Sequence, residues 1–179
     1  GFSNATKQEK AEATFLQTYF LWLLTDHFGQ TILREPKEVS SVPSIYWTRS
    51  EAIDKEITML EAVINDLPAY SPSSAFKASK NAGYALLAKL YLNKAVYKAT
   101  DADGKPQVVT PAMFQSADMD KVIEYTDKAM AGTSFTNIAG NNAGQNYFQN
   151  FAPDNGEKST EIIFSKQNTN SIASAMFQF

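Results

Sequence analysis

The stretch KNAGYALLAKLYLNKAVY, residues 80–97, decides the fold that we predict for this chain. It is apolar nearly all round, and only Lys89, Asn93 and Lys94, with Lys98 just beyond, mark a hydrated edge. A helix that is apolar on most of its circumference must be buried on most of it. We therefore expect this helix to lie at the centre of the core, with other helices packed around it.

Three further helices are predicted, at about residues 7–28, 49–67 and 118–131, because apolar residues recur there at three- and four-residue spacing. Thr48 and Glu51 have the spacing of a capping box at the start of the second. Gly29 and Gly132 suit the left-handed position just after a helix. Residues 35–47, 99–115 and 133–146 are predicted loops, and residues 161–165 (EIIFS) are a predicted strand.

Composition narrows the possible functions. The 179 residues carry 16 basic and 19 acidic side chains, a net charge of -3, without a basic stripe, so nucleic acid is not a predicted partner. The absence of cysteine excludes disulfides and thiol chemistry, and with His27 as the sole histidine we predict neither a metal nor a cofactor. The most apolar stretch, residues 15–24, is shorter than the roughly 20 residues of a membrane span.

The chain is expected to form a single, mostly α domain over residues 1–179. A helical scaffold would occupy about residues 7–132, and a loop and strand region about residues 133–179. The N-terminal GFS carries no signal-like segment, and the C-terminal AMFQF is apolar without a polar tail. These features lead us to expect a fragment of a longer protein.

Signals for catalysis are weak, and no enzyme activity is predicted. Adjacent residues of a helix point in different directions, so Asp26 and His27 do not form an acid–base pair. The sequence DADG at residues 101–104 has its glycine too early for a calcium loop and predicts a turn. Glu56, Glu61 and Asp66 are expected on the solvated side of their helix, without the pairing that glycoside hydrolysis requires.

The last two helices can be aligned with the tetratricopeptide pattern, in which two antiparallel helices approach through small residues. Ala88 and Ala129 would allow the close approach, and Tyr84 and Tyr91 would lock it. Thr126 stands where the pattern usually has an aromatic residue. We therefore predict tetratricopeptide-like helical hairpins with long loops, and a short β element near the C-terminus.

Several stretches, in order, are similar to those of the SusD/RagB family. EATFLQTYF at residues 12–20 resembles the family's first helix, with Gln17 where arginine is usual. The turn at Glu35-Pro36, the helix ending in Leu67-Pro68, the run at residues 80–93 and the helix at 122–130 follow. Tyr147, Phe148, Phe151 and Asp154-Asn155 then precede residues 161–164. The resemblance covers about residues 10–167, with an enlarged insert at residues 99–115.

This resemblance implies a function. SusD-like proteins are lipoproteins of the outer-membrane surface that bind oligosaccharides without breaking bonds and cover a SusC-like TonB-dependent transporter. Their lipid anchor is attached to a cysteine that this sequence lacks, and they are longer than this chain. We therefore expect non-catalytic oligosaccharide binding and delivery to such a transporter. The alternative is a tetratricopeptide-type scaffold for protein–protein interaction, which would need three or more repeats.

Sugar binding requires aromatic faces flanked by polar groups. Tyr46 and Trp47, with Arg49 close by, are the candidate carbohydrate-binding residues. A competing interpretation is that Trp47 packs against the start of the following helix as a hydrophobic staple. The asparagine-rich residues 137–150 are a second candidate, better explained as a surface loop, and Trp22 is expected in the core or an interface.

Overall fold

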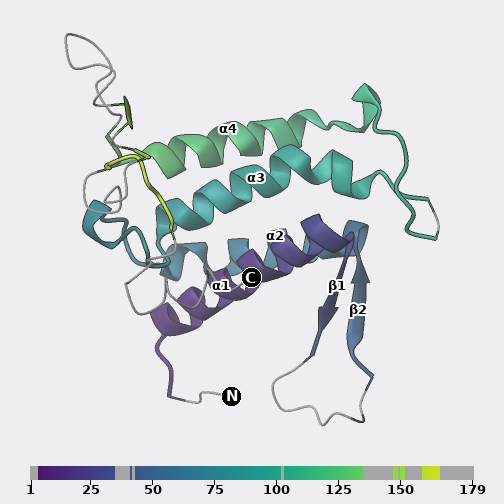
Figure 1. Ribbon diagram of the computed structural model, residues 1–179, viewed down its shortest axis with the longest axis horizontal. Coiled ribbons are helices and arrows are strands. Elements are labelled where there is room, and N and C mark those ends of the chain that lie inside the picture. The colour runs from purple at the N-terminus through teal and green to yellow at the C-terminus, as the bar shows by residue number, and fades with distance from the viewer. Residues whose placement is uncertain are drawn as a thin grey trace.

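The computed structural model confirms that the chain is mostly helical, with a small two-stranded antiparallel sheet (Figure 1). It describes residues 4–34, 41, 43–101, 103–134, 147–148, 150–151 and 159–165. The helices and strands are α1 (Lys7–Phe28), β1 (Gln30–Leu33), β2 (Ile45–Thr48), α2 (Arg49–Val63), α3 (Lys80–Lys98) and α4 (Ser116–Met130). Short 3₁₀ helices lie in the connections: η1 (Ile64–Asp66), η2 (Pro72–Ser74) and η3 (Pro111–Met113).

The helix ends follow from local chemistry. The predicted capping box at Thr48 and Glu51 is present, and a second one, which we did not predict, joins Thr6 and Glu9 at the start of α1. In each box the threonine oxygen accepts from the backbone N–H of the glutamate, whose carboxylate accepts from the threonine N–H. Gly29 ends α1 with a φ of 68°, the left-handed conformation that glycine adopts without strain.

A β-hairpin stands where part of the predicted loop at residues 35–47 was expected. Ile45–Thr48 forms β2, which pairs with β1 so that Thr31 lies opposite Trp47 and Ile32 opposite Tyr46. Each strand has only four residues, too few to show a clear alternation in the sequence. The pairing therefore became visible only in three dimensions.

The predicted strand at residues 161–165 is wrong. The described part of the chain has no strand there. The Ser165 N–H donates to the carbonyl of Ala75 over 2.9 Å, and the segment is held mainly by Ile163 and Phe164, which pack against the core. An apolar run becomes a strand only where another strand offers a free edge, and here the backbone bonds to Ala75 and to the Tyr70 hydroxyl instead.

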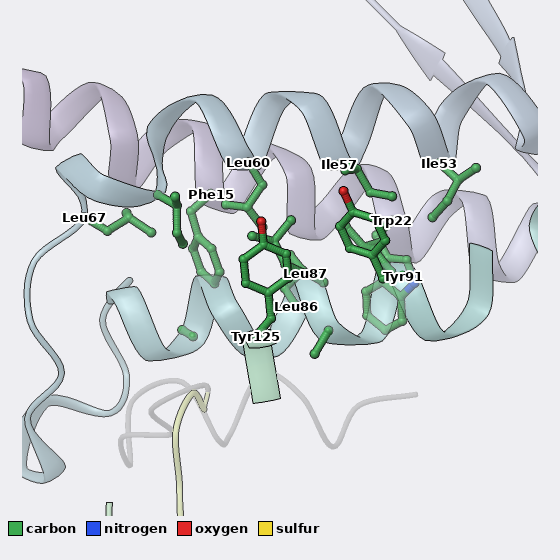
Figure 2. Close-up of a cluster of buried hydrophobic side chains, with 14 of the residues drawn as sticks. Phe15, Trp22, Ile53, Ile57, Leu60, Leu67, Leu86, Leu87, Tyr91 and Tyr125 are labelled. Atoms are coloured by element: carbon green, nitrogen blue, oxygen red, sulfur yellow. The ribbon is translucent and has the colours of Figure 1, made fainter. Parts of the chain in front are cut away.

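The prediction that α3 is the central helix is confirmed. It contributes ten buried residues, more than any of the other three helices, and Leu87 and Leu90 are fully buried. Figure 1 shows α4 lying along α3, with α2 and α1 on the other side. Figure 2 shows rings and aliphatic side chains from all four helices meeting in the core: Phe15, Trp22, Ile53, Ile57, Leu60, Leu86, Leu87, Tyr91 and Tyr125.

Helices α3 and α4 are antiparallel neighbours. The side-chain amide of Asn81, near the start of α3, donates to the carbonyls of Ala129 and Ala131, at the end of α4, over 2.8 and 2.7 Å. At the other end, Lys94 pairs with Asp118 over 2.8 Å. These contacts fix the register of the two helices. The likeness to a tetratricopeptide hairpin stays a prediction.

An aromatic residue of α4 does enter this interface, one position before the expected one. Tyr125, rather than Thr126, has its ring centroid 5.8 Å from that of Tyr84 and 5.8 Å from that of Tyr91. Its hydroxyl donates to the Glu61 carboxylate over 2.7 Å, and the Tyr91 hydroxyl donates to the same oxygen over 2.9 Å. One carboxylate of α2 therefore ties α3 and α4 together.

The expectation that Glu56 and Glu61 lie on the solvated side of their helix is wrong. Glu61 is partly buried beneath the two tyrosines, and Glu56 is fully buried, whereas Asp66 is exposed as expected. Glu56 shares its helical face with Ile53, Ile57 and Leu60, and α1 covers this face. We expected Glu56 on the solvated side because it is charged, although its position in the helix places it on the buried face.

Candidate functional site

The three predicted sugar-binding residues do not converge. Neighbouring side chains of a strand point to opposite faces, and in β2 Trp47 turns inward, opposite the buried Thr31, while Tyr46 turns outward and is exposed. Trp47 is partly buried, with the Lys55 ammonium 5.0 Å from its ring centroid. The two rings therefore cannot form one stacking platform.

Arg49 has a structural role. Its guanidinium donates to the carbonyls of Tyr97 and Ala99, over 3.1 and 3.4 Å, and to that of Val96. These carbonyls belong to the C-terminal end of α3, where the last helical C=O groups have no partners within the helix. A cation there also interacts favourably with the helix dipole. Arg49 therefore caps α3 from the first turn of α2.

A pocket of about 390 Å³ lies between α1, α3 and residues 161–164. We call it the aromatic pocket. Its lining residues are Phe15, Tyr19, Trp22, Leu23, Ala82, Ala85, Leu86, Lys89, Glu161, Ile163 and Phe164. The small side chains of Ala82 and Ala85 on α3 leave the space that the rings of α1 and Phe164 enclose. The volume is within the range of small-ligand sites.

Four aromatic rings fix the shape of this pocket. Phe164 stands edge-on to Phe15, with ring centroids 5.1 Å apart, and to Tyr19, with centroids 5.5 Å apart. Tyr19 in turn lies 5.9 Å from Trp22. Such edge-to-face arrangements are favourable and leave ring faces and edges presented toward the cavity. Phe15 and Trp22, labelled in Figure 2, also belong to the core, which makes this wall rigid.

Polar groups stand beside the rings. The Lys89 ammonium lies 4.3 Å from the centroid of Trp22, and Glu161 is one of the lining residues. The indole N–H of Trp22 donates to the Tyr97 hydroxyl over 3.2 Å, and that hydroxyl donates to Asp26 over 2.5 Å. Burial, together with the bond to Asp26, raises the pKa of Tyr97 to about 12. Trp22 is therefore held in one orientation by a neutral hydroxyl.

A second hollow of about 490 Å³ lies on the other side of Tyr19 and Phe164. It is lined by Leu16, Tyr19, Phe20, Leu23, Phe76, Phe164 and Ser165, and is almost entirely apolar. It shares Tyr19, Leu23 and Phe164 with the aromatic pocket. We call it the apolar hollow.

Sequence reasoning missed the aromatic pocket, although it placed Trp22 correctly in the core. One feature of the sequence could have indicated the pocket: apolar residues cover more of the helix at residues 7–28 than a single buried face requires. The second signal was Phe164, which the predicted strand had assigned to a sheet. The asparagine-rich candidate at residues 137–150 lies almost wholly outside the described residues, which include only 147, 148 and 150 of it.

The other residues that we considered for catalysis or metal binding make structural contacts instead. Asp26 accepts from Tyr97, whereas the Nδ1 atom of His27 contacts the carbonyl of Leu23 at 2.8 Å, so the two side chains diverge. The predicted turn at residues 101–104 is confirmed: Asp101 accepts from the N–H groups of Asp103 and Lys105. Among the described residues, no group of three or more His, Asp or Glu side chains could hold a metal ion.

Comparison with known proteins gives no relative: no family model, curated protein or solved structure matches the chain. Within the described residues, none of the helices has the length and apolar character needed to span a membrane.

Proposed function

We propose that this chain binds an oligosaccharide without catalysis, as part of a SusD-like surface lipoprotein that delivers glycans to a TonB-dependent outer-membrane transporter. The aromatic pocket is the observation that carries the binding part of this proposal. The ordered sequence resemblance to the SusD/RagB family supports the surface location and the transporter as partner. The proposed site moves from Tyr46, Trp47 and Arg49 to the pocket on α1 and α3.

The chemistry of the pocket fits a sugar ring. The C–H-rich faces of a pyranose stack on aromatic side chains, and its hydroxyls need hydrogen-bond partners at the edge of the stack. Tyr19 and Phe164 supply aromatic surface, the Lys89 ammonium supplies donors, and Glu161 also lines the pocket. The pocket is partly open to solvent, as a chain of several sugar units requires.

The two tryptophans allow the two candidate sites to be told apart. Trp22 lies in the aromatic pocket and Trp47 on the hairpin. Trp47→Phe leaves Trp22 as the sole tryptophan, and Trp22→Phe leaves Trp47. Each variant would be titrated with a panel of oligosaccharides while tryptophan emission is recorded. We expect a saturable change with Trp47→Phe and none with Trp22→Phe.

Two lysines provide a matched pair for the affinity. Lys89→Ala removes the cation over Trp22, and Lys55→Ala removes the cation over Trp47. Losing a hydrogen bond from a charged donor is expected to weaken binding roughly tenfold for Lys89→Ala. Lys55→Ala should leave the dissociation constant unchanged. A larger effect of Lys55→Ala than of Lys89→Ala, or a signal only from Trp47, would place the site on the hairpin. Equal effects of the two variants would reject the aromatic pocket as the site, and no binding by the wild-type chain would reject the proposal for this chain.

The tetratricopeptide-type scaffold is the alternative function. The described residues contain one antiparallel pair of the expected kind, α3 and α4, whereas peptide-binding superhelices stack several. This geometry offers less support for a peptide groove than the aromatic pocket offers for a sugar.

A further inference from the structure

A ridge of large apolar side chains runs along the exposed surface of α1. Leu16, Phe20, Leu24 and Phe28 follow one another at four-residue spacing and are 41%, 59%, 39% and 71% exposed. We call these four residues the α1 ridge. At about 200 Å² for a fully exposed large side chain, the ridge presents on the order of 400 Å² of apolar surface. The largest apolar patch of a typical monomer has about this size and is often a functional surface.

The charge pattern of α1 points to the kind of partner. Residues 13–25 carry no charged side chain, and the charges of α1 lie at its two ends, at residues 7–12 and at Asp26. In a dimer with two-fold symmetry, a charge near the axis meets its own copy and repels it. The middle of the α1 ridge carries no charge, so two copies would not repel each other there. A partner that binds through complementary charges would meet no charged side chain there.

The shape of the ridge is self-complementary. Leucine and phenylalanine alternate along it, so an antiparallel pair with its axis between Phe20 and Leu24 sets Phe20 against Leu24 of the second copy. The same axis sets Leu16 against Phe28 of the second copy. Helices that cross at about 20° stay in contact over several turns, as this pairing requires. Large residues facing smaller ones interlock without clashes.

The apolar hollow completes the fit. It lies beside Leu16 and Phe20, where this arrangement brings Phe28 of the second copy. Phe28 has the most exposed ring of the ridge, and the hollow of about 490 Å³ has room for a phenyl group. Complete burial of two ridges removes roughly 800 Å² from solvent, which approaches the 1,000 Å² or so that a specific interface needs. The exposed residues Ala13 and Gln17 beside the ridge would add to this area.

We infer that α1 is a self-association surface, through which two copies of this chain pair in antiparallel fashion along the α1 ridge. This inference goes beyond the oligosaccharide proposal and does not rest on it. The aromatic pocket lies on the other side of Tyr19, between α1 and α3. Pairing through the ridge fills the apolar hollow and leaves the aromatic pocket accessible.

The test is the mass of the whole chain in solution. Sedimentation velocity and light scattering from about 1 to 200 μM should show a concentration-dependent shift from 19.8 kDa toward twice that mass. Phe20→Glu places two like charges across the interface and is expected to weaken dimerisation at least 100-fold. Ile123→Glu is the matched control, since Ile123 is a 62% exposed apolar residue on α4. It should leave the dimer intact.

Phe28→Ala is a second variant, which leaves α1 without a new charge. It should weaken the dimer, because the Phe28 ring of the second copy would no longer fill the apolar hollow. Circular dichroism and thermal unfolding of each variant show whether it is folded. A monomer at every concentration, or a dimer that Phe20→Glu and Ile123→Glu affect equally, overturns the inference. Loss of the dimer in Phe20→Glu and Phe28→Ala alone supports it.

Discussion

Raising the pH from 5 to 8 is expected to ionise a carboxyl group that the fold keeps away from water. Glu56 is fully buried on α2, and its Oε1 atom accepts from the Thr25 hydroxyl over 2.7 Å. In the described part of the chain, its Oε2 atom has no hydrogen-bond partner. Burial therefore raises the pKa of Glu56 from 4.5 to about 7, with the bond from Thr25 opposing part of the rise.

The size and sign of the effect follow from proton linkage. In the unfolded chain Glu56 ionises near its ordinary value, and in the folded chain near 7, so between these values the folded state holds one more proton. Stability then falls as the pH rises through this window, and the loss is complete above pH 7. At 1.36 kcal/mol for each pKa unit, the difference corresponds to about 3 kcal/mol.

Urea unfolding at pH 5, 6, 7 and 8 measures this loss, and Glu56→Gln removes its cause. The wild-type free energy of unfolding should drop by about 2.5 kcal/mol across the series, because part of the total loss already falls below pH 5. Glu56→Gln should be nearly flat, and more stable than wild type at pH 8 even though its amide nitrogen also lacks a partner. Glu12→Gln, at a partly exposed position of α1, is the control and should keep the wild-type slope. Equal wild-type stability at pH 5 and 8, or an unchanged slope in Glu56→Gln, would refute the reasoning.

Three further substitutions test the packing by urea unfolding at one pH. Arg49→Ala should lower the free energy of unfolding by about 1–2 kcal/mol, because it uncovers the carbonyls at the end of α3; no loss would mean that solvent satisfies them equally well. Tyr125→Phe should lose about 1–2 kcal/mol with its bond to Glu61, while Tyr46→Phe, at an exposed ring, should lose nothing measurable. Gly83→Ala should destabilise by about 1 kcal/mol or more despite its better helix propensity, because the new Cβ would lie 2.3 Å from a core side chain of η1; a more stable variant would show that this side chain moves aside.

The sequence alone determined the helices and most of their ends to within two residues. The exception is the end of α2, which was predicted near Leu67 but lies at Val63, where the chain continues as the 3₁₀ helix η1. Capping boxes and terminal glycines act over three or four residues, so Thr48, Glu51 and Gly29 carry their meaning within a short stretch of chain. The central place of α3 was equally readable, because a helix that is apolar nearly all round has to be buried. These are properties of composition and spacing, which do not depend on where other elements lie.

The candidate site was not readable in the same way. Tyr46, Trp47 and Arg49 are close in sequence, but strand alternation and the capping of α3 send their side chains apart. The aromatic pocket instead draws on residues 15–23, 82–89 and 161–164. Residue type and local spacing cannot show that these three segments meet.

The same limit explains the other errors. Ile45–Thr48 and residues 161–165 differ in outcome because the first pairs with the free edge of β1, whereas the second packs Ile163 and Phe164 against the core. Glu56 was assigned to solvent because carboxylates are usually exposed, and only the packing of α1 on α2 shows that its position is buried. Helix boundaries are set by neighbours along the chain, whereas strands, pockets and buried charges are set by neighbours in space, and tertiary structure alone decides those.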